Sequence, residues 1–590
     1  MSVRTVHIET FGCQMNELDS ELVVGQLRAL GYRLSADPDA ASVVLYNTCS
    51  VREHAEQKVW SRLGELALRK LREPNLVVGV LGCLAERDGV ALAKRMPVVD
   101  ILCGPGELDK LPTLLDNAVR TRESLSAEMA PVSDEDSGER VRLVSAGQVA
   151  LQGSASRRSA TLAAANDTLE LLDLSRSISP VDIGAYGAEV SEDDGTPKRS
   201  AYVRITRGCN KFCTYCVVPF TRGAEIHRPP DHIVDECKRL AAAGVIEITL
   251  LGQTVNHYRF EHGAAVSING IVQPQKGRSY AGGHRRDPFA GSSTTTFADL
   301  LARIHDEVPS IQRLRFVTSY PRDFGDDALQ VIRDCPRICR YLHVPAQSGS
   351  DRILKLMNRG YEVAEYLDFV ERARATLHQP EIGRPLMLAG DFIVGFPTET
   401  EEDFAMTMDL ARRVRYKNSF IFKYSPRPGT VAIEKHEDDV PEAVKRRRNN
   451  ELLALQTAMS NEVSREQVGT THAVFVEGLS RQERKRQERK RSQGSGIVSL
   501  TIGASDPSRG KGSDATCSDG CATSHVLAED VVSVPTGDDA VQYSGRTEGD
   551  LIVFFEAPAK KSRELVGRIV PVRINSAENL GLRGELEAER

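Results

Sequence analysis

The sequence lacks any long apolar segment and contains few aromatic residues, which are 5% of the chain with one tryptophan. No uncharged apolar run reaches the roughly 18 residues that a membrane-spanning helix needs. Residues 1–9 lack the apolar stretch and cleavage site of a signal peptide, so we expect a cytoplasmic protein without membrane contact. The 76 basic and 82 acidic residues give a net charge of −6. This balance excludes a uniformly basic nucleic-acid-binding protein, but a local basic surface remains compatible with it.

At 590 residues, the chain is too long for a single domain of roughly 100–200 residues. The hydrophobic share of 41% is that of a globular protein. Twelve cysteines in a large cytoplasmic protein are better candidates for metal ligands or buried thiols than for disulfides.

Alternating apolar runs and helical patterns predict an α/β protein. In residues 1–125, apolar runs alternate with helical spacing, which indicates a parallel sheet whose ligands gather beyond the carboxyl ends of the strands. Residues 198–440 repeat the pattern about six times, which predicts a partial (β/α)6 TIM-like barrel. Residues 260–295, rich in glycine, serine and arginine, form an insertion that is expected on the active face of this barrel.

The remaining segments have other compositions. Residues 126–197 are rich in serine, alanine and acidic residues and are interpreted as a low-complexity insertion. Residues 441–465 are expected to be a linker helix. Residues 466–590 are expected to form a small β domain interrupted by an insertion at 481–540. The first eleven residues of this insertion carry seven basic and two acidic groups, which fits either a solvated helical face with ion pairs or added RNA affinity.

Cys209, Cys213 and Cys216 give the strongest chemical signal. Their C-x3-C-x2-C spacing follows a predicted strand. Thiolates bind iron well, and three of them can hold an iron–sulfur cluster with one iron left open for a substrate or cofactor. The alternative is a structural zinc loop with a fourth ligand elsewhere in the chain.

A second trio comes from cysteines that are distant in sequence. Cys13, Cys49 and Cys83 each follow the end of a predicted strand. If those strands are parallel neighbours, the three thiols meet at one edge of the sheet and could hold a second cluster. The alternative is three ordinary buried cysteines.

Polar residues and glycine also follow the predicted strands of the barrel. Gln253, Gln347, Ser348 and Gly395 occupy such positions, where a polar cofactor would sit. Simple turn chemistry would explain each of them alone. Cys517 and Cys521 lie in the last insertion and could form a local metal or redox pair.

Residues 207–223, around the C-x3-C-x2-C motif, resemble the radical S-adenosylmethionine (SAM) enzymes, and within them the methylthiotransferases. The segments around Cys13, Cys49 and Cys83 resemble the amino-terminal domain of the same family. The resemblance implies a 4Fe-4S cluster on each trio and SAM bound by Gln253, Gln347, Ser348 and Gly395. Residues 477–480, 543–547 and 577–584 resemble the RNA-binding TRAM domain, where Arg546 and Arg583 would contact phosphates.

Within the family, residues 12–16 and 49–53 resemble the branch that acts on N6-isopentenyladenosine, also called dimethylallyladenosine, in tRNA. The resemblance then implies transfer of a methylthio group to carbon 2 of the adenine at position 37. It also implies the tRNA anticodon stem-loop as partner, a flavodoxin- or ferredoxin-type electron donor, and a monomer. The alternatives are the branch acting on threonylcarbamoyladenosine and a non-catalytic iron–sulfur RNA-binding module.

Overall fold

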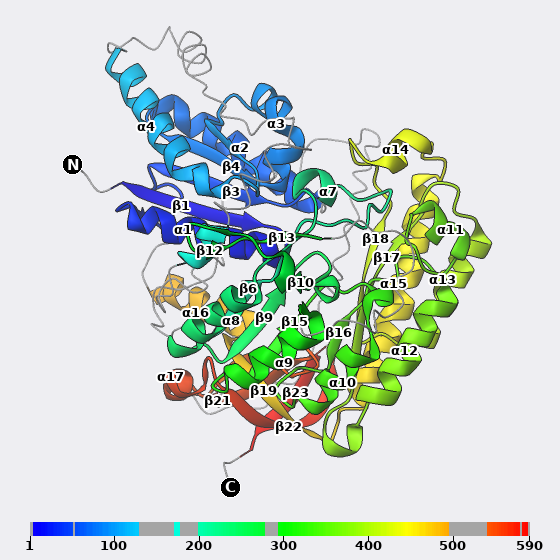
Figure 1. The fold of residues 1–590 in the computed structure, drawn as a ribbon. Helices are drawn as coiled ribbons and strands as arrows, with labels where there is room; N and C mark the ends of the chain where they lie inside the picture. The colour runs from blue at the N-terminus through cyan, green and yellow to red at the C-terminus, as the bar shows by residue number, and fades with distance from the viewer. Residues whose placement is uncertain are drawn as a thin grey trace, which may run out of the picture.

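The computed structural model describes residues 4–50, 53–128, 170–176, 199–277, 293–494, 540–578 and 581–587. These residues form three regions: an N-terminal α/β domain, a central barrel and a C-terminal β-barrel (Figure 1). No helix among them is long and apolar enough to cross a membrane.

The N-terminal domain is a five-stranded parallel sheet in the order β2-β1-β3-β4-β5. Strands β3 and β4 are buried on both faces, because helices cover the sheet on each side. Its elements are β1 (Thr5–Phe11), α1 (Gln14–Ala29), β2 (Arg33–Leu34), β3 (Val43–Thr48), α2 (Glu53–Arg72), β4 (Val77–Gly82), α3 (Cys83–Arg95), β5 (Ile101–Cys103) and α4 (Leu111–Glu128).

The central region contains two three-stranded parallel sheets, β15-β9-β6 and β16-β17-β18. A parallel bridge between Leu314 and Ile338 joins them into one curved, open barrel, which confirms the predicted class. The strands are β6 (Ser200–Arg204), β9 (Glu247–Leu251), β15 (Arg313–Phe316), β16 (Tyr341–His343), β17 (Met387–Val394) and β18 (Asn418–Lys423). The main helices on the outside are α8 (Pro230–Ala242), α9 (Phe297–Glu307), α10 (Asp326–Asp334), α11 (Asp351–Leu356), α12 (Val363–Leu377) and α13 (Glu401–Val414).

Shorter elements surround the carboxyl ends of these strands. A small antiparallel sheet is built from β7 (Thr206–Arg207), β8 (Ile226–His227) and β13 (Gln275–Lys276), so the inserted segment 260–295 contributes one of its strands. The others are α7 (Val218–Thr221), β10 (Arg259–Glu261), β11 (Ser267–Ile268), β12 (Ile271–Val272), β14 (Thr294–Thr296) and α14 (Val431–Lys435).

Helix α15 (Glu442–Arg465) packs along β18 and leads to a closed five-stranded barrel in the order β19-β20-β21-β23-β22. This small barrel packs on the amino ends of the central strands, where Arg313 and Arg315 donate to the carbonyls of Arg546 and Thr547. Its elements are β19 (Thr471–Leu479), α16 (Arg481–Gly494), β20 (Ala540–Arg546), β21 (Ile552–Pro558), α17 (Ser562–Leu565), β22 (Ile569–Glu578) and β23 (Gly581–Leu586). The basic repeat at 481–490 is therefore helical, and Glu483 pairs with Arg486 on it.

Residues 170–176 form a strap between the N-terminal domain and the central barrel, and its charged side chains are buried. Although burial opposes ionisation, the guanidinium groups of Arg204, Arg207 and Arg228 hold the pKa of Asp173 below its ordinary value. Asp173 accepts from Arg204 at 2.5 Å and also from Arg207. At the other end of the strap, Arg176 pairs with Glu21 of the N-terminal domain at 2.6 Å and Glu236 of the barrel at 2.8 Å. Part of the segment interpreted as low-complexity thus carries charges that join two domains.

We expect Asp173→Ala to destabilise the protein by about 3–5 kcal/mol, because it leaves buried guanidinium groups without their counter-charge. Thermal denaturation of the cluster-loaded protein measures this effect. The matched control is Asp235→Ala, because the Asp235 side chain is 69% exposed and pairs with Lys238 only at 3.9 Å. Equal melting temperatures for the two variants would contradict the role of the strap.

Candidate functional site

Cys13, Cys49 and Cys83 come together at one edge of the N-terminal sheet. Phe11 pairs with Thr48 and Thr48 pairs with Gly82 in register, so β1, β3 and β4 end side by side. Each cysteine follows its strand end by one or two residues. Cys49 hydrogen-bonds the thiolate of Cys13, and this bond is the main reason that the pKa of Cys13 is lowered to about 6. The sequence-predicted convergence of the three thiols is therefore present in the structure.

A buried amide pair positions the first of these cysteines. Asn16 Oδ1 lies 3.4 Å from Cys13 Sγ, and Asn16 Nδ2 donates to Asn47 Oδ1 at 3.0 Å. Asn47 Nδ2 in turn donates to the Asn16 carbonyl at 2.9 Å. Both amides are completely buried, so they hold the start of α1 against the end of β3.

Arg222 brings a positive charge from the central barrel to this trio. Its guanidinium donates to Asp19 Oδ2 at 2.9 Å, and the Arg222 side chain is only 6% exposed. Burial raises the pKa of Cys83, and the charge of Arg222 opposes that rise. A fixed cation near thiols favours the thiolate form, which is the form that binds metals.

Cys209, Cys213 and Cys216 lie on the loop between β7 and α7. The backbone of Thr214 anchors this loop, since its amide donates to the Met357 carbonyl at 3.0 Å and its carbonyl accepts from Ala432 at 2.8 Å. Arg359 Nη1 lies 3.4 Å from Cys213 Sγ and supplies a second buried cation beside thiols. Lys211, on the same loop, pairs with Asp323 at 2.6 Å.

The two trios lie near each other at the junction of the two domains. Burial raises the pKa of Cys216 to about 12, with a further contribution from Cys213 and a smaller one from Cys83 of the other trio. Contacts between α3, which begins at Cys83, and α7, which follows Cys216, are consistent with this proximity. All six cysteines are free thiols, so both sites present the soft sulfur donors that iron–sulfur clusters require.

The four residues predicted to bind SAM differ in their surroundings. Gln253 follows β9 and is half-buried. Gln347 has a left-handed φ of 70° and is joined to β17 through backbone bonds with Asp391 and Ile393. Gly395, with φ 70°, packs against Lys445 of α15, where an added Cβ would lie 2.4 Å from Lys445 Cγ. Whether these residues contact SAM stays a prediction.

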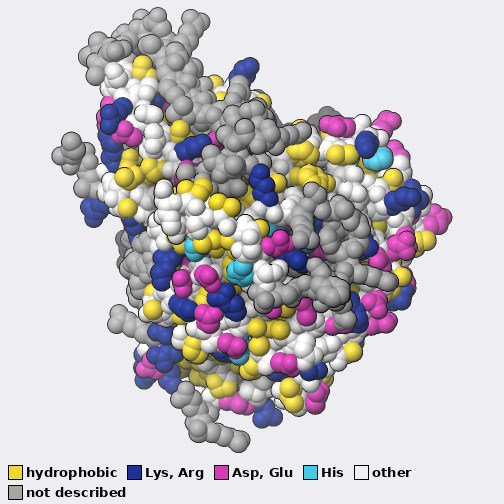
Figure 2. Space-filling model, in the orientation of Figure 1, with side chains coloured by type: hydrophobic (Ala, Val, Ile, Leu, Met, Phe, Trp, Pro, Cys, Tyr) yellow, Lys and Arg dark blue, Asp and Glu magenta, His cyan; other side chains and the backbone are white. Residues whose placement is uncertain are grey.

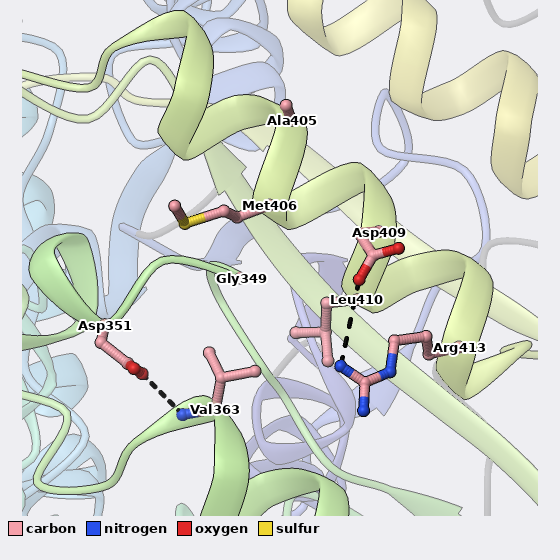
Figure 3. A pocket seen from close by; sticks show the side chains of 8 residues that line it. All are labelled: Gly349, Asp351, Val363, Ala405, Met406, Asp409, Leu410 and Arg413. Carbon is pink, nitrogen blue, oxygen red and sulfur yellow. Dashed lines mark hydrogen bonds and ion pairs between the residues drawn. The ribbon is translucent and has the colours of Figure 1, made fainter.

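Ser348 is buried and turned toward α13. Its Oγ lies 3.4 Å from Thr407 Oγ1, and the amide of the next residue, Gly349, donates to the same hydroxyl at 3.0 Å. Figure 3 shows the shallow groove beside Gly349, with Met406 of α13 on one side and Asp351 on the other. Ser348 therefore anchors this turn to the outer helix layer, and its contact with SAM also stays a prediction.

The inner face of the second half-barrel carries two open aromatic rings. Phe420 and Phe422 of β18 are 47% and 38% exposed, and their rings stack with an interplanar angle of 18°. Ile421, between them, points the other way and packs against the core. Phe420 also contacts the ring of His343 edge-on, and His343 Nε2 lies 3.1 Å from Asp391 Oδ1. This face offers an aromatic surface beside polar groups.

The other cysteines in the described part of the chain are free thiols away from both trios. Cys103 ends β5 and its Sγ donates to the carbonyls of Gly104 and Glu107. Cys237 and Cys339 are buried, and Cys335 is half-buried. Cys517 and Cys521 lie outside the described residues.

Sequence reasoning assigned no role to Arg222, Arg359, Asp19 or Asn16. Arg222 and Asn16 lie in the segments that carry the family resemblance, but neither spacing nor residue type shows which thiol they would approach. Their roles depend on packing between segments far apart in the chain.

Comparison with known proteins gives two family models. Residues 5–104 match the uncharacterized protein family UPF0004, and residues 203–411 match the radical SAM superfamily. Among solved structures, the cobalamin-dependent SAM radical enzyme OxsB is similar with 10% identity and a TM-score of 0.43, over 84% of this chain and 71% of that one.

Curated relatives extend over more of the chain. The tRNA-2-methylthio-N(6)-dimethylallyladenosine synthase of Rhodopirellula baltica is 41% identical over 81% of this chain and 84% of its own length. The synthase of the same name from Dichelobacter nodosus is 35% identical over 100% of this chain and 97% of its own. Both family models and these relatives together show that the chain belongs to the radical SAM family of tRNA-2-methylthio-N(6)-dimethylallyladenosine synthases.

Proposed function

We propose that this protein transfers a methylthio group to carbon 2 of N6-dimethylallyladenosine at position 37 of tRNA, using two SAM molecules and two 4Fe-4S clusters. The observation that carries the proposal is the pair of three-cysteine sites that lie near each other at the domain junction. An electron carrier would gain nothing from two clusters that each lack one protein ligand, whereas a group transfer needs open iron at both. The names of the curated relatives support the same reaction.

Each trio has its own part in this reaction. Cys209, Cys213 and Cys216 hold the cluster that binds SAM, and Cys13, Cys49 and Cys83 hold the auxiliary cluster. When bound, the clusters and SAM supply an adenosyl radical, a sulfur atom and a methyl group. The chain's own residues bind and orient the clusters and SAM and shield them from water. Arg222 and Arg359 balance the charge of the thiolates, and the domain junction excludes water.

The adenine must leave its stack to reach this buried site, and an anticodon loop makes that easier than a duplex would. Phe420 and Phe422 present a stacking surface for such a base. Gln253, Gln347, Ser348 and Gly395 stay our candidates for holding SAM at the mouth of the barrel.

The remaining partners follow from the same reaction. The C-terminal barrel would hold the anticodon stem-loop, with Arg546 and Arg583 near phosphates. Reduction of the cluster requires a flavodoxin- or ferredoxin-type donor. We also propose that the protein acts as a monomer in the cytoplasm.

The direct test uses anaerobic protein with both clusters, dithionite, SAM and an isopentenylated anticodon stem-loop RNA. Nucleoside mass spectrometry should detect 2-methylthio-N6-isopentenyladenosine. Product only on threonylcarbamoylated RNA would move the protein to that branch of the family. Intact clusters without SAM cleavage would instead indicate a non-catalytic RNA-binding module.

Single cysteine variants should separate the two sites. Cys13→Ala should lose about half of the bound iron and all methylthiolation while 5′-deoxyadenosine still forms, because the SAM-binding trio is intact. Cys209→Ala should abolish 5′-deoxyadenosine formation. Cys103→Ala is the matched control, since this thiol ends the neighbouring strand β5 and donates to the backbone carbonyls of Gly104 and Glu107. Loss of iron in the control alone would refute the assignment.

Removing a phosphate contact should weaken RNA binding without changing the chemistry. Arg583 pairs with Glu578 at 3.0 Å and its side chain is 43% exposed, so it can exchange that partner for a phosphate. Arg583→Ala should reduce the slope of log affinity against log salt by about one, as measured by RNA-binding titrations. Arg303→Ala, on the outer helix α9, should leave the slope unchanged. Identical slopes for the two variants would contradict an RNA contact at Arg583.

A further inference from the structure

A group of three metal-ligand side chains lies beside the SAM-binding trio and has no part in the reaction above. Glu225, His227 and His257 each offer one ligand atom, and these atoms all lie within 4.8 Å of one another. Glu225 and His227 belong to the segment that forms β8, and His257 lies in the short helical turn after β9. We propose that these three residues bind one divalent zinc-type metal ion, separate from both cysteine sites.

Burial makes this group costly without a cation. The Glu225 side chain is completely buried, with Oε2 lying 2.5 Å from His257 Nδ1 and Oε1 accepting from Thr254 at 2.8 Å. The positive charge of Lys211 also acts on Glu225, but the Lys211 ammonium forms its ion pair with Asp323, at 2.6 Å. A buried carboxylate is normally balanced by a fixed positive charge, and a bound metal ion supplies one.

His227 is a buried imidazole whose hydrogen bonding is incomplete. Its residue is 2% exposed, its Nε2 is the nitrogen on the Glu225 side, and its Nδ1 is buried without a hydrogen-bond partner among the described residues. Buried polar atoms in folded proteins are nearly always paired, and an orphan is a recognised mark of an ion or water. The rings of His227 and His257 approach edge-on, with centroids 6.0 Å apart, so both imidazoles border the same space.

Two imidazoles and one carboxylate are a donor set that zinc takes in sites with three protein ligands and one open position. Tetrahedral bonds of about 2.0 Å place ligand atoms about 3.3 Å apart. The ligand atoms, all within 4.8 Å of one another, therefore need only small side-chain movements to close around an ion.

Residues 275–277 of the inserted segment lie against this group. Strand β13 pairs with β8, and the Gly277 amide donates to the Glu225 carbonyl at 2.8 Å. A Cβ added to Gly277 would lie 2.8 Å from both Glu225 Oε2 and His227 Nε2, so the backbone passes directly over two of the three ligands. Asn210 joins this cover to the cysteine loop, because its Nδ2 donates to the Gly277 carbonyl at 3.1 Å and its Oδ1 accepts from the Glu225 amide at 3.0 Å. The ion would thus tie the inserted strand and the barrel mouth together next to Cys209.

The experiment uses full-length protein carrying both clusters, incubated with one equivalent of zinc sulfate and desalted. We expect about one tightly bound zinc per chain by elemental analysis. Zinc K-edge X-ray absorption should show a nitrogen and oxygen shell at about 2.0–2.1 Å and no sulfur shell at about 2.3 Å, which separates this site from zinc on cysteines. Neither readout depends on methylthiotransferase activity.

Variants locate the ion. His257→Ala and Glu225→Gln should each lower bound zinc to background while iron content stays at the parent level. His305→Ala is the matched control: its Nε2 also lacks a partner among the described residues, but His305 belongs to no such three-ligand group. A sulfur shell, no retained zinc, or equal zinc in all three variants would overturn the proposal. Glu225→Gln retains the side-chain shape. If His257→Ala fails to fold, the zinc content of Glu225→Gln therefore still decides the test.

Discussion

The buried ion pairs at the junction between the N-terminal domain and the barrel are the interaction on which the rest of the structure depends. Asp19 of α1 accepts from Arg204 at 3.0 Å and from Arg222 at 2.9 Å, and both arginines belong to the barrel. Buried charges are costly unless they are paired in good geometry, so this contact favours one relative placement of the domains. That placement brings the two cysteine trios close together.

The strap at residues 170–176 completes the same junction. Glu170 binds Arg228 at 3.1 Å, and Arg176 spans both domains through Glu21 and Glu236. The C-terminal barrel packs at the opposite, amino end of the central strands, where Lys417 binds Asp550 at 2.9 Å. The N-terminal domain therefore packs at the open mouth of the central barrel, where the cysteine loop lies. In Figure 2, acidic and basic side chains are interspersed over the described part of the visible face, as the small net charge leads one to expect.

Sequence patterns predicted much of the fold because helices and strands are indicated by residues close together in the chain. Strand–helix alternation indicated the parallel sheet and the six-stranded open barrel, and both are present. Cys13, Cys49 and Cys83 could be grouped from sequence because parallel strands end at one sheet edge. The turn at Ser348 shows the limit of this reasoning. A polar residue after a strand can face the mouth of the barrel or an outer helix, and here it bonds Thr407 of α13.

The sequence by itself determined the two cysteine trios, the α/β class and the family, since spacing and hydrophobic period carry that information along the chain. Only the tertiary structure decided that Arg222 lies beside Cys83, that the strap joins two domains, and that Glu225, His227 and His257 come together. The physical reason is that the partners of buried charges and imidazoles are distant in sequence. The local hydrophobic period does not indicate which residues will be those partners.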